Sequence, residues 1–307
     1  MDIRSAFLDE TGRIRSGWRF AIFCLGFICV VMVVGGLASA VLSLLGPAFI
    51  EGGGGLLATA LTALTGALLV GWLCGKYLEG LPFRALGAWF TKGWLRNLIV
   101  GILFGAGTLT IAVLIAYAAG GLRFEFNNID SSVLTRSLIV SFLIFALGAA
   151  WEEALFRGYI LQTFARSGLA ALAIVLTSVF FGAIHASNPN VSKLAVINTM
   201  LGGVWFGIAY LKTRDLWFVW GMHLMWNWMQ GAFFGIEVSG ITNLVSAPLL
   251  REIDGGPLWL TGEAYGVEGG IATTIALIVS TVVIYFMPYL KPSEEMLILS
   301  GSQNRER

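Results

Sequence analysis

The chain has 307 residues, of which 57% are hydrophobic and only 12% are charged, and its mean hydropathy is +0.82. Soluble domains carry about 25% charged residues, so this composition excludes an ordinary soluble globular protein. It predicts an all-α, polytopic membrane protein whose first partner is the lipid bilayer. The formal net charge of +1 gives no reason to expect a nucleic-acid partner, and the oligomeric state stays open.

Eight segments are predicted to be membrane-spanning helices, which need about 20 mostly apolar residues each. They lie at about residues 20–45, 56–75, 98–118, 137–165, 169–185, 194–211, 216–234 and 271–289. The chain then divides into a cytoplasmic segment with three helices (1–136), a core of helices four to seven (137–234), an extracytoplasmic loop (235–270), and a last helix with a cytoplasmic tail (271–307). Gly101, Gly105 and Gly107 in the third span predict close helix packing.

The basic residues predict the orientation of these helices. With the N-terminus inside and eight alternating spans, 14 of the 19 Lys and Arg residues fall in cytoplasmic segments and four fall outside. Cytoplasmic loops of membrane proteins carry such an excess of positive charge. We therefore expect a multi-pass protein of the cell (inner) membrane with both termini in the cytoplasm. The remaining basic residue, Arg157, lies within the fourth span.

Charged residues cluster inside that fourth span, in the sequence Trp-Glu-Glu-Ala-Leu-Phe-Arg at 151–157. Each charge in hydrocarbon costs about 2.5–3.5 kcal/mol on insertion scales, and such residues are usually functional. Glu153 and Arg157 stand four apart in the favourable order for a helical ion pair, so we expect a supporting, structural role for them. Glu152 points about 100° away around the helix. It is left without that partner, which suits a general acid or base.

The two histidines of the chain also lie in apolar segments. His185 follows Phe181 by four residues in the fifth span, and His223 precedes Asn227 by four in the seventh. Each group taken singly is often only a hydrogen-bonding contact between helices. Counted along the helices from the cytoplasmic turns, Glu152, the two histidines and Asn227 lie at depths of roughly 12–27 Å at 1.5 Å per residue, a spread that helix tilt can absorb. One polar cavity within the bilayer could hold them together with the charged residues of the fourth span.

Three motifs occur in the order Glu152-Glu153-x-x-x-Arg157, Phe181-x-x-x-His185 and His223-x-x-x-Asn227. They resemble those of the CAAX-protease and bacteriocin-processing family (CPBP or Abi, type II CAAX prenyl endopeptidase-like), and bacterial members in particular, over about residues 137–234. The resemblance implies a peptidase, specifically an intramembrane endopeptidase that acts on a membrane-associated or prenylated-type protein or peptide. It implies that Glu152 and His185 activate water, that His223 and Asn227 stabilise the oxyanion, and that Glu153, Arg157 and Phe181 support them.

Three alternatives stay open. His185 and His223 with a carboxylate could ligate Zn²⁺ and leave a position for water, and some of the family are called metalloproteases; we favour water activated directly by Glu152, with zinc as the alternative and no other cofactor. A non-catalytic immunity or scaffold protein on the same fold would keep the helices without the activity. A proton-coupled transporter would use the same polar groups as a relay, but it predicts inverted repeats or broken helices, and the sequence shows no convincing pair.

Overall fold

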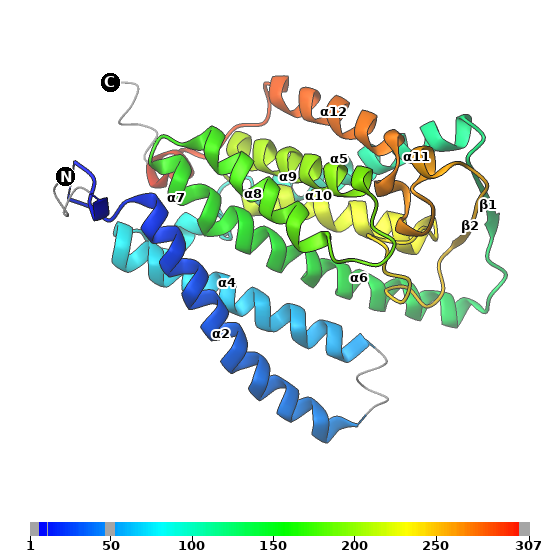
Figure 1. Cartoon of the computed structure of the whole chain (residues 1–307), viewed down its shortest axis with the longest axis horizontal. Helices are drawn as coiled ribbons and strands as arrows, with labels where there is room; N and C mark the ends of the chain where they lie inside the picture. The colour runs from blue at the N-terminus through cyan, green and yellow to red at the C-terminus, as the bar shows by residue number, and fades with distance from the viewer. Residues whose placement is uncertain (1–5, 11, 47–52, 301–307) are drawn as a thin grey trace.

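The computed structural model describes residues 6–10, 12–46 and 53–300, and these form a nearly all-α protein (Figure 1). The helices are α2 (Ser16–Leu45), α4 (Gly55–Glu79), η2 (Phe83–Leu86), α5 (Trp94–Ala118), α6 (Ser131–Glu153), η3 (Ala154–Ile160), α7 (Leu161–Arg166), α8 (Ala170–His185), α9 (Lys193–Thr213), α10 (Leu216–Trp228), η4 (Met229–Phe233), α11 (Leu258–Thr261), η5 (Glu263–Tyr265), η6 (Val267–Gly269), α12 (Ile271–Phe286) and α13 (Glu294–Leu299). Each of the eight predicted spans coincides with helix. The predicted fold class, a polytopic helical membrane protein, is confirmed.

Five helical segments are long and apolar enough to cross a membrane, namely Ser16–Leu45, Gly55–Glu79, Trp94–Ala118, Ser131–Arg166 and Lys193–Thr213. The helices α8 and α12 are apolar but shorter, and α10 continues into the π-helix η4. The number of crossings and the orientation therefore stay predictions. Arg4, Arg305 and Arg307, three of the basic residues that support the orientation, lie outside the described residues.

The fourth predicted span is one continuous helix in which α6, the π-helix η3 and α7 follow one another. The change from α to π geometry comes directly after Glu153, and Arg157 lies within the wider turn. At the end of η3 the Leu161 N–H donates to the Phe156 carbonyl, five residues back. Short π segments inside α-helices frequently mark functional sites, and this one begins directly after the two adjacent glutamates and contains the arginine.

The helices α5 and α10 pack closely against each other, and glycine on α5 permits this approach. A Cβ atom on Gly101 or Gly105 would lie 2.1 Å from the Phe218 or Met222 carbonyl oxygen of α10. The prediction of close packing is therefore confirmed at these two positions. It is wrong for Gly107, where an added Cβ would meet nothing within 4 Å, because that residue faces away from α10.

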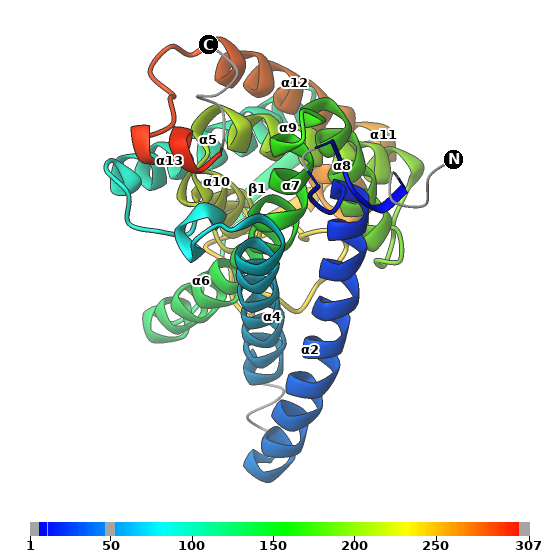
Figure 2. The same ribbon diagram turned by 90° about the vertical axis from the view of Figure 1, so that its left-hand side faces the viewer.

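The helices α2 and α4 lie side by side (Figures 1 and 2), and α4 also packs against α6 and η3. Most of α2 is exposed, and only 6% of its most apolar window is buried, so its side chains are available to lipid. The end near residue 16 is fixed to the body by a cluster of charges. Glu79 pairs with Arg19 of α2 and with Arg166 of α7, the latter at 2.9 Å from Arg166 Nη2 to Glu79 Oε2.

The region 235–270, predicted as a polar loop, is folded. It contributes the strand β2 (Leu250–Asp254), which pairs antiparallel with β1 (Leu122–Phe126) in the register Leu122 to Asp254. The short helices α11, η5 and η6 follow before α12 begins. This two-stranded sheet is the exception to the all-α prediction. The folded loop also lies against the bundle, where it closes one side of the cavity described below.

Candidate active site

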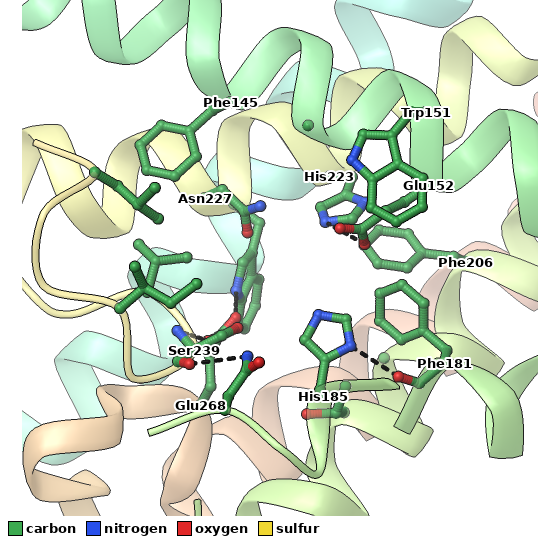
Figure 3. Close-up of a pocket in the computed structure, with 18 of the residues that line it drawn as sticks. Phe145, Trp151, Glu152, Phe181, His185, Phe206, His223, Asn227, Ser239 and Glu268 are labelled. Atoms are coloured by element: carbon green, nitrogen blue, oxygen red, sulfur yellow. Dashed lines mark hydrogen bonds and ion pairs between the residues drawn. The ribbon is translucent and has the colours of Figure 1, made fainter. Parts of the chain in front are cut away.

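A cavity of about 320 Å³ lies between α6, α8, α9 and α10, and the segment 238–244 closes one side of it. Glu152, Phe181, His185, His223 and Asn227, all predicted from the sequence, line this one cavity (Figure 3). Its volume lies at the lower end of the range of small-molecule sites, about 300–1,000 Å³. The other two predicted residues, Glu153 and Arg157, are not part of the lining and lie buried behind it.

A buried network of ion pairs and hydrogen bonds lies behind the cavity wall and connects Arg157, Glu153 and His223. Arg157 is fully buried, and its Nη1 lies 3.1 Å from Glu153 Oε1 while its Nη2 donates to the Gly203 carbonyl at 3.1 Å. The same Glu153 oxygen lies 2.8 Å from His223 Nδ1. The predicted pairing of Glu153 with Arg157 is thus present, and Glu153 has a second partner that its sequence position did not reveal. Glu153 joins α6 to α10 and sets the orientation of the His223 ring.

Aromatic rings enclose the Arg157 guanidinium. Its central carbon lies 5.6, 5.0 and 5.1 Å from the ring centres of Phe156, Phe181 and Phe206. These distances are within the range of cation–π attraction, about 6 Å. Phe206 also stacks on His223 at 4.7 Å between centroids. One aromatic layer therefore separates the arginine from the cavity and holds the histidine ring.

Glu152 faces the ionisable side chain of His223 on α10. Its Oε2 lies 3.8 Å from His223 Nε2, which is too far for a direct hydrogen bond. Among the described residues this buried oxygen has no hydrogen-bond partner. A polar contact at such a distance is one that a water molecule can bridge. Glu152 therefore presents an unsatisfied acceptor to the cavity, next to an imidazole.

His185 enters the cavity from the wall opposite Glu152 and His223 (Figure 3). Its Nδ1 lies 2.7 Å from the Phe181 carbonyl oxygen. Because a carbonyl only accepts, Nδ1 carries the proton and a neutral ring keeps its lone pair on Nε2. The sequence predicted that Glu152 and His185 act as a pair. In the described part of the chain no direct contact joins them, so any joint action passes through a molecule bound between them.

Asn227 lies one helical turn after His223 on α10, and its amide faces the same cavity (Figure 3). The spacing of four residues places both side chains on one face of the helix. An amide N–H and an imidazole N–H are both donors suited to a developing negative charge. The side chains of His223 and Asn227 therefore both reach the same region of the cavity.

Residues 134–229 match the model of the family described as Type II CAAX prenyl endopeptidase Rce1-like. The resemblance inferred from the three motifs is confirmed. Over 147 residues the chain is also 25% identical to the "Uncharacterized protein YyaK" of Bacillus subtilis (strain 168). That match covers 48% of this chain and 46% of YyaK, so the chain spans about half the length of this curated relative.

The Rce1-like segment does not contain the whole cavity, because Ser239 and Glu268 from the folded loop complete it. Glu268 Oε1 accepts from Trp226 Nε1 at 2.9 Å, and its Oε2 accepts from the Ser239 backbone N–H at 2.7 Å and hydroxyl at 2.8 Å. Sequence reasoning missed this carboxylate. The available signal was a lone glutamate in the glycine-rich stretch at 266–270, directly before an apolar helix.

The described donors around the cavity do not form a three-ligand zinc site. A catalytic zinc needs three protein ligands at about 2.0–2.2 Å. In the part of the chain that the structure describes, no three His, Cys, Asp or Glu side chains lie close enough to hold one ion. His185 and His223 approach the cavity from different walls, and His223 Nδ1 is engaged by Glu153. The arrangement does not fit a three-ligand zinc site, so we derive no step through a metal.

Proposed function

We propose that this protein is an intramembrane endopeptidase that hydrolyses a peptide bond of a membrane-associated or prenylated-type substrate. The observation that carries the proposal is the unpartnered Glu152 oxygen, 3.8 Å from His223 Nε2, in a cavity lined by family motif residues from three helices. The family match supports a peptidase. We place the protein in the cell (inner) membrane with both termini in the cytoplasm, on the strength of its apolar helices and charge distribution.

The first step is attack by water. Glu152 accepts a proton from a water molecule in the cavity, and the lone pair on His185 Nε2 orients that molecule from the opposite wall. The resulting hydroxide adds to the carbonyl carbon of the scissile bond. The carbonyl π electrons move to oxygen and give a tetrahedral intermediate with one negative charge.

The second step is collapse of this intermediate. Asn227, and His223 in its doubly protonated form, donate hydrogen bonds to the oxyanion. Glu153 and Arg157 hold the His223 ring in place during the reaction and do not touch the substrate. The carbon–nitrogen bond then breaks, and Glu152 returns its proton to the leaving amine. The acyl part of the substrate is released with a new C-terminal carboxyl group.

The test compares membrane-peptide cleavage in cells that carry wild type or Glu152→Gln, followed by turnover measurements on an identified substrate. Glutamine keeps the size of glutamate but cannot accept the proton, so we expect folding and binding to be retained and turnover to fall about 10²–10⁴-fold. The turnover of Asn227→Ala should fall by about 10²–10³-fold, because one oxyanion donor is removed. Glu125→Gln, on the exposed sheet, serves as the matched control. The proposal would be refuted if Glu152→Gln, His185→Ala and His223→Ala, each measured separately, all turned over the substrate at the wild-type rate.

A second arm of the same assay addresses metal. The enzyme is incubated with a strong chelator, dialysed, and assayed with and without added Zn²⁺. Because the mechanism uses Glu152 directly, we expect turnover to be unchanged throughout. Loss of activity that zinc restores, with stoichiometric zinc in the purified protein, would assign the water activation to a metal.

A further inference from the structure

A second cavity, of about 1050 Å³, lies at the end of the bundle where the chain begins. Its lining comes from the N-terminal segment, the first turns of α2, and the ends of α4, α7 and α13 with the residues next to them. The N-terminal segment and α7 lie at this same end of the molecule in Figure 1. None of its described lining residues lines the candidate active site, so the proposed hydrolysis does not use this cavity.

Arginine dominates the charge of this second cavity. The described lining residues include four arginines and two carboxylates, namely Arg13, Arg15, Arg19, Arg166, Asp9 and Glu79. The arginines therefore exceed the carboxylates by two positive charges. A concave surface lined by one sign of charge concentrates ions of the opposite sign. The lining thus favours an anionic ligand.

One carboxylate, Glu79, serves two guanidinium groups that are largely buried. Glu79 Oε1 accepts from Arg19 Nη1 and from Arg166 Nε, the latter at 3.0 Å, and its Oε2 accepts from Arg166 Nη2 at 2.9 Å. The side chains of Arg19, Arg166 and Glu79 are 6%, 11% and 4% exposed. A buried charge is costly unless it is paired. Among these three side chains one positive charge is in excess, and an anion in the cavity would neutralise it.

Donors for such an anion are present on Arg19 and Arg13. A guanidinium carries five N–H groups, and Arg19 makes one hydrogen bond each to the Ile14 carbonyl, Glu79 and the Ser167 hydroxyl. Two of its N–H groups therefore remain for another acceptor. The Arg13 guanidinium makes no hydrogen bond or ion pair within the part of the chain that the structure describes, where only its backbone N–H donates to Asp9. Guanidinium groups match the oxygens of a phosphate, which they bind through two parallel N–H bonds.

The cavity adjoins the exposed apolar surface of α2. Trp18 lines the cavity and is 45% exposed, and Ile22 and Leu25 on the following turns are 42% and 66% exposed. Tryptophan is enriched at the level of the lipid headgroups. The N-terminal segment is fixed to this residue, because Trp18 Nε1 donates to the Ala6 carbonyl at 3.0 Å and its ring stacks on Phe7. A ligand with an anionic head and apolar chains would fit here, with the head among the arginines and the chains along α2.

We propose that this cavity binds a phosphate group, and that its ligand in the membrane is a phospholipid whose headgroup carries phosphate without a compensating cation. Arg13 and Arg19 donate to the phosphate oxygens, while Arg166 stays paired with Glu79. Basic pockets at a membrane surface bind anionic headgroups in this way. A choline headgroup would bring its own ammonium group among the arginines and lose the net attraction. The inference does not depend on the proposed peptidase function.

The experiment measures lipid binding to the delipidated full-length protein in detergent by native mass spectrometry. The protein is titrated separately with phosphatidylglycerol, with phosphatidylcholine of the same acyl chains, and with glycerol 3-phosphate. A basic side chain near a membrane surface contributes about 1 kcal/mol to the binding of an anionic lipid, which is about fivefold in affinity. We therefore expect one phosphatidylglycerol to bind about fivefold or more tightly than phosphatidylcholine.

Three variants test whether the arginines of the cavity cause this preference. Arg13 is exposed, so Arg13→Gln should keep the fold and weaken phosphatidylglycerol binding about fivefold. Lys92→Gln is the matched control, because it removes the same charge from an exposed position outside the cavity and should leave binding unchanged. In Arg19→Gln the preference over phosphatidylcholine should disappear. Because this last change also breaks a contact with Glu79, its melting temperature is recorded in parallel.

The three titrations also separate the two possible sources of the phosphate. Much weaker binding of glycerol 3-phosphate than of phosphatidylglycerol supports the lipid as ligand, whereas equal binding of the two supports a phosphate site that a soluble anion fills. Equal affinities for phosphatidylglycerol and phosphatidylcholine, without binding of glycerol 3-phosphate, would overturn the proposal. So would equal affinities of Arg13→Gln and Lys92→Gln for phosphatidylglycerol, because the attraction would then not come from this cavity.

Discussion

Replacing Arg157 by methionine tests whether the charges behind the cavity hold the fold together. The substitution removes the ion pair with Glu153 at 3.1 Å, the hydrogen bond to Gly203 and the contact with three aromatic rings. It leaves the Glu153 carboxylate buried with His223 as its remaining partner. Breaking a buried pair by removal of one partner costs about 3–5 kcal/mol. On the scale of soluble domains of 150–250 residues, about 2–4 °C per kcal/mol, the melting temperature should fall by roughly 6–20 °C.

The pair Arg251–Glu125 on the sheet supplies the matched control. Its atoms are closer, at 2.7 Å, but the two side chains are 68% and 57% exposed, against 0% and 1% for Arg157 and Glu153. Exposed pairs contribute about 0–1 kcal/mol. Arg251→Met should therefore change the melting temperature little, although it breaks the shorter contact. Comparing the two separates burial from distance as the source of the effect.

The assay is thermal unfolding of the purified variants in detergent, with a double-mutant cycle. Arg157→Met with Glu153→Gln removes both charges, so its loss of stability should be smaller than the sum of the two single losses. The coupling should be at the upper end of the range for residues in contact, about 0.5–3 kcal/mol. A normal melting temperature for Arg157→Met, or additive losses in the double variant, would refute the structural role assigned to the pair.

Three further outcomes follow from the structure. Gly101→Ala should strongly lower stability and yield, because its Cβ would lie 2.1 Å from a carbonyl oxygen of α10, while Gly107→Ala on the same helix should be neutral; equal yields would refute the close packing. Burial, with a smaller contribution from neighbouring carboxylates, raises the pKa of Glu252 to about 8. The protonated form therefore favours folding, and the free energy of unfolding should decrease as pH rises from about 4.5 through 8. In melting curves recorded over this pH range, Glu252→Gln should reduce the pH dependence, and an unchanged pH dependence would contradict the prediction. Reporter fusions after Leu290 and within 235–270 should report opposite sides of the membrane, and a shared side would exclude the eight-span topology.

The sequence by itself determined the helices and the residues of the three motifs. A run of about 20 apolar residues defines a spanning helix without reference to its neighbours. The ion pair Glu153–Arg157 was predictable for the same reason, because residues four apart on one helix are neighbours whatever surrounds them. The π turn between them did not prevent the contact.

Only the tertiary structure decided which groups from different helices meet. Spacing along α6 leaves Glu152 without a partner, but the rotation and depth of α10 bring His223 to within 3.8 Å of it and place Glu153 against the other ring nitrogen. Glu268 reaches the cavity because the loop folds back onto the bundle and its carboxylate captures three donors. These contacts depend on how whole helices and loops pack, which local periodicity does not specify, and they determine the charge of the cavity that a substrate meets.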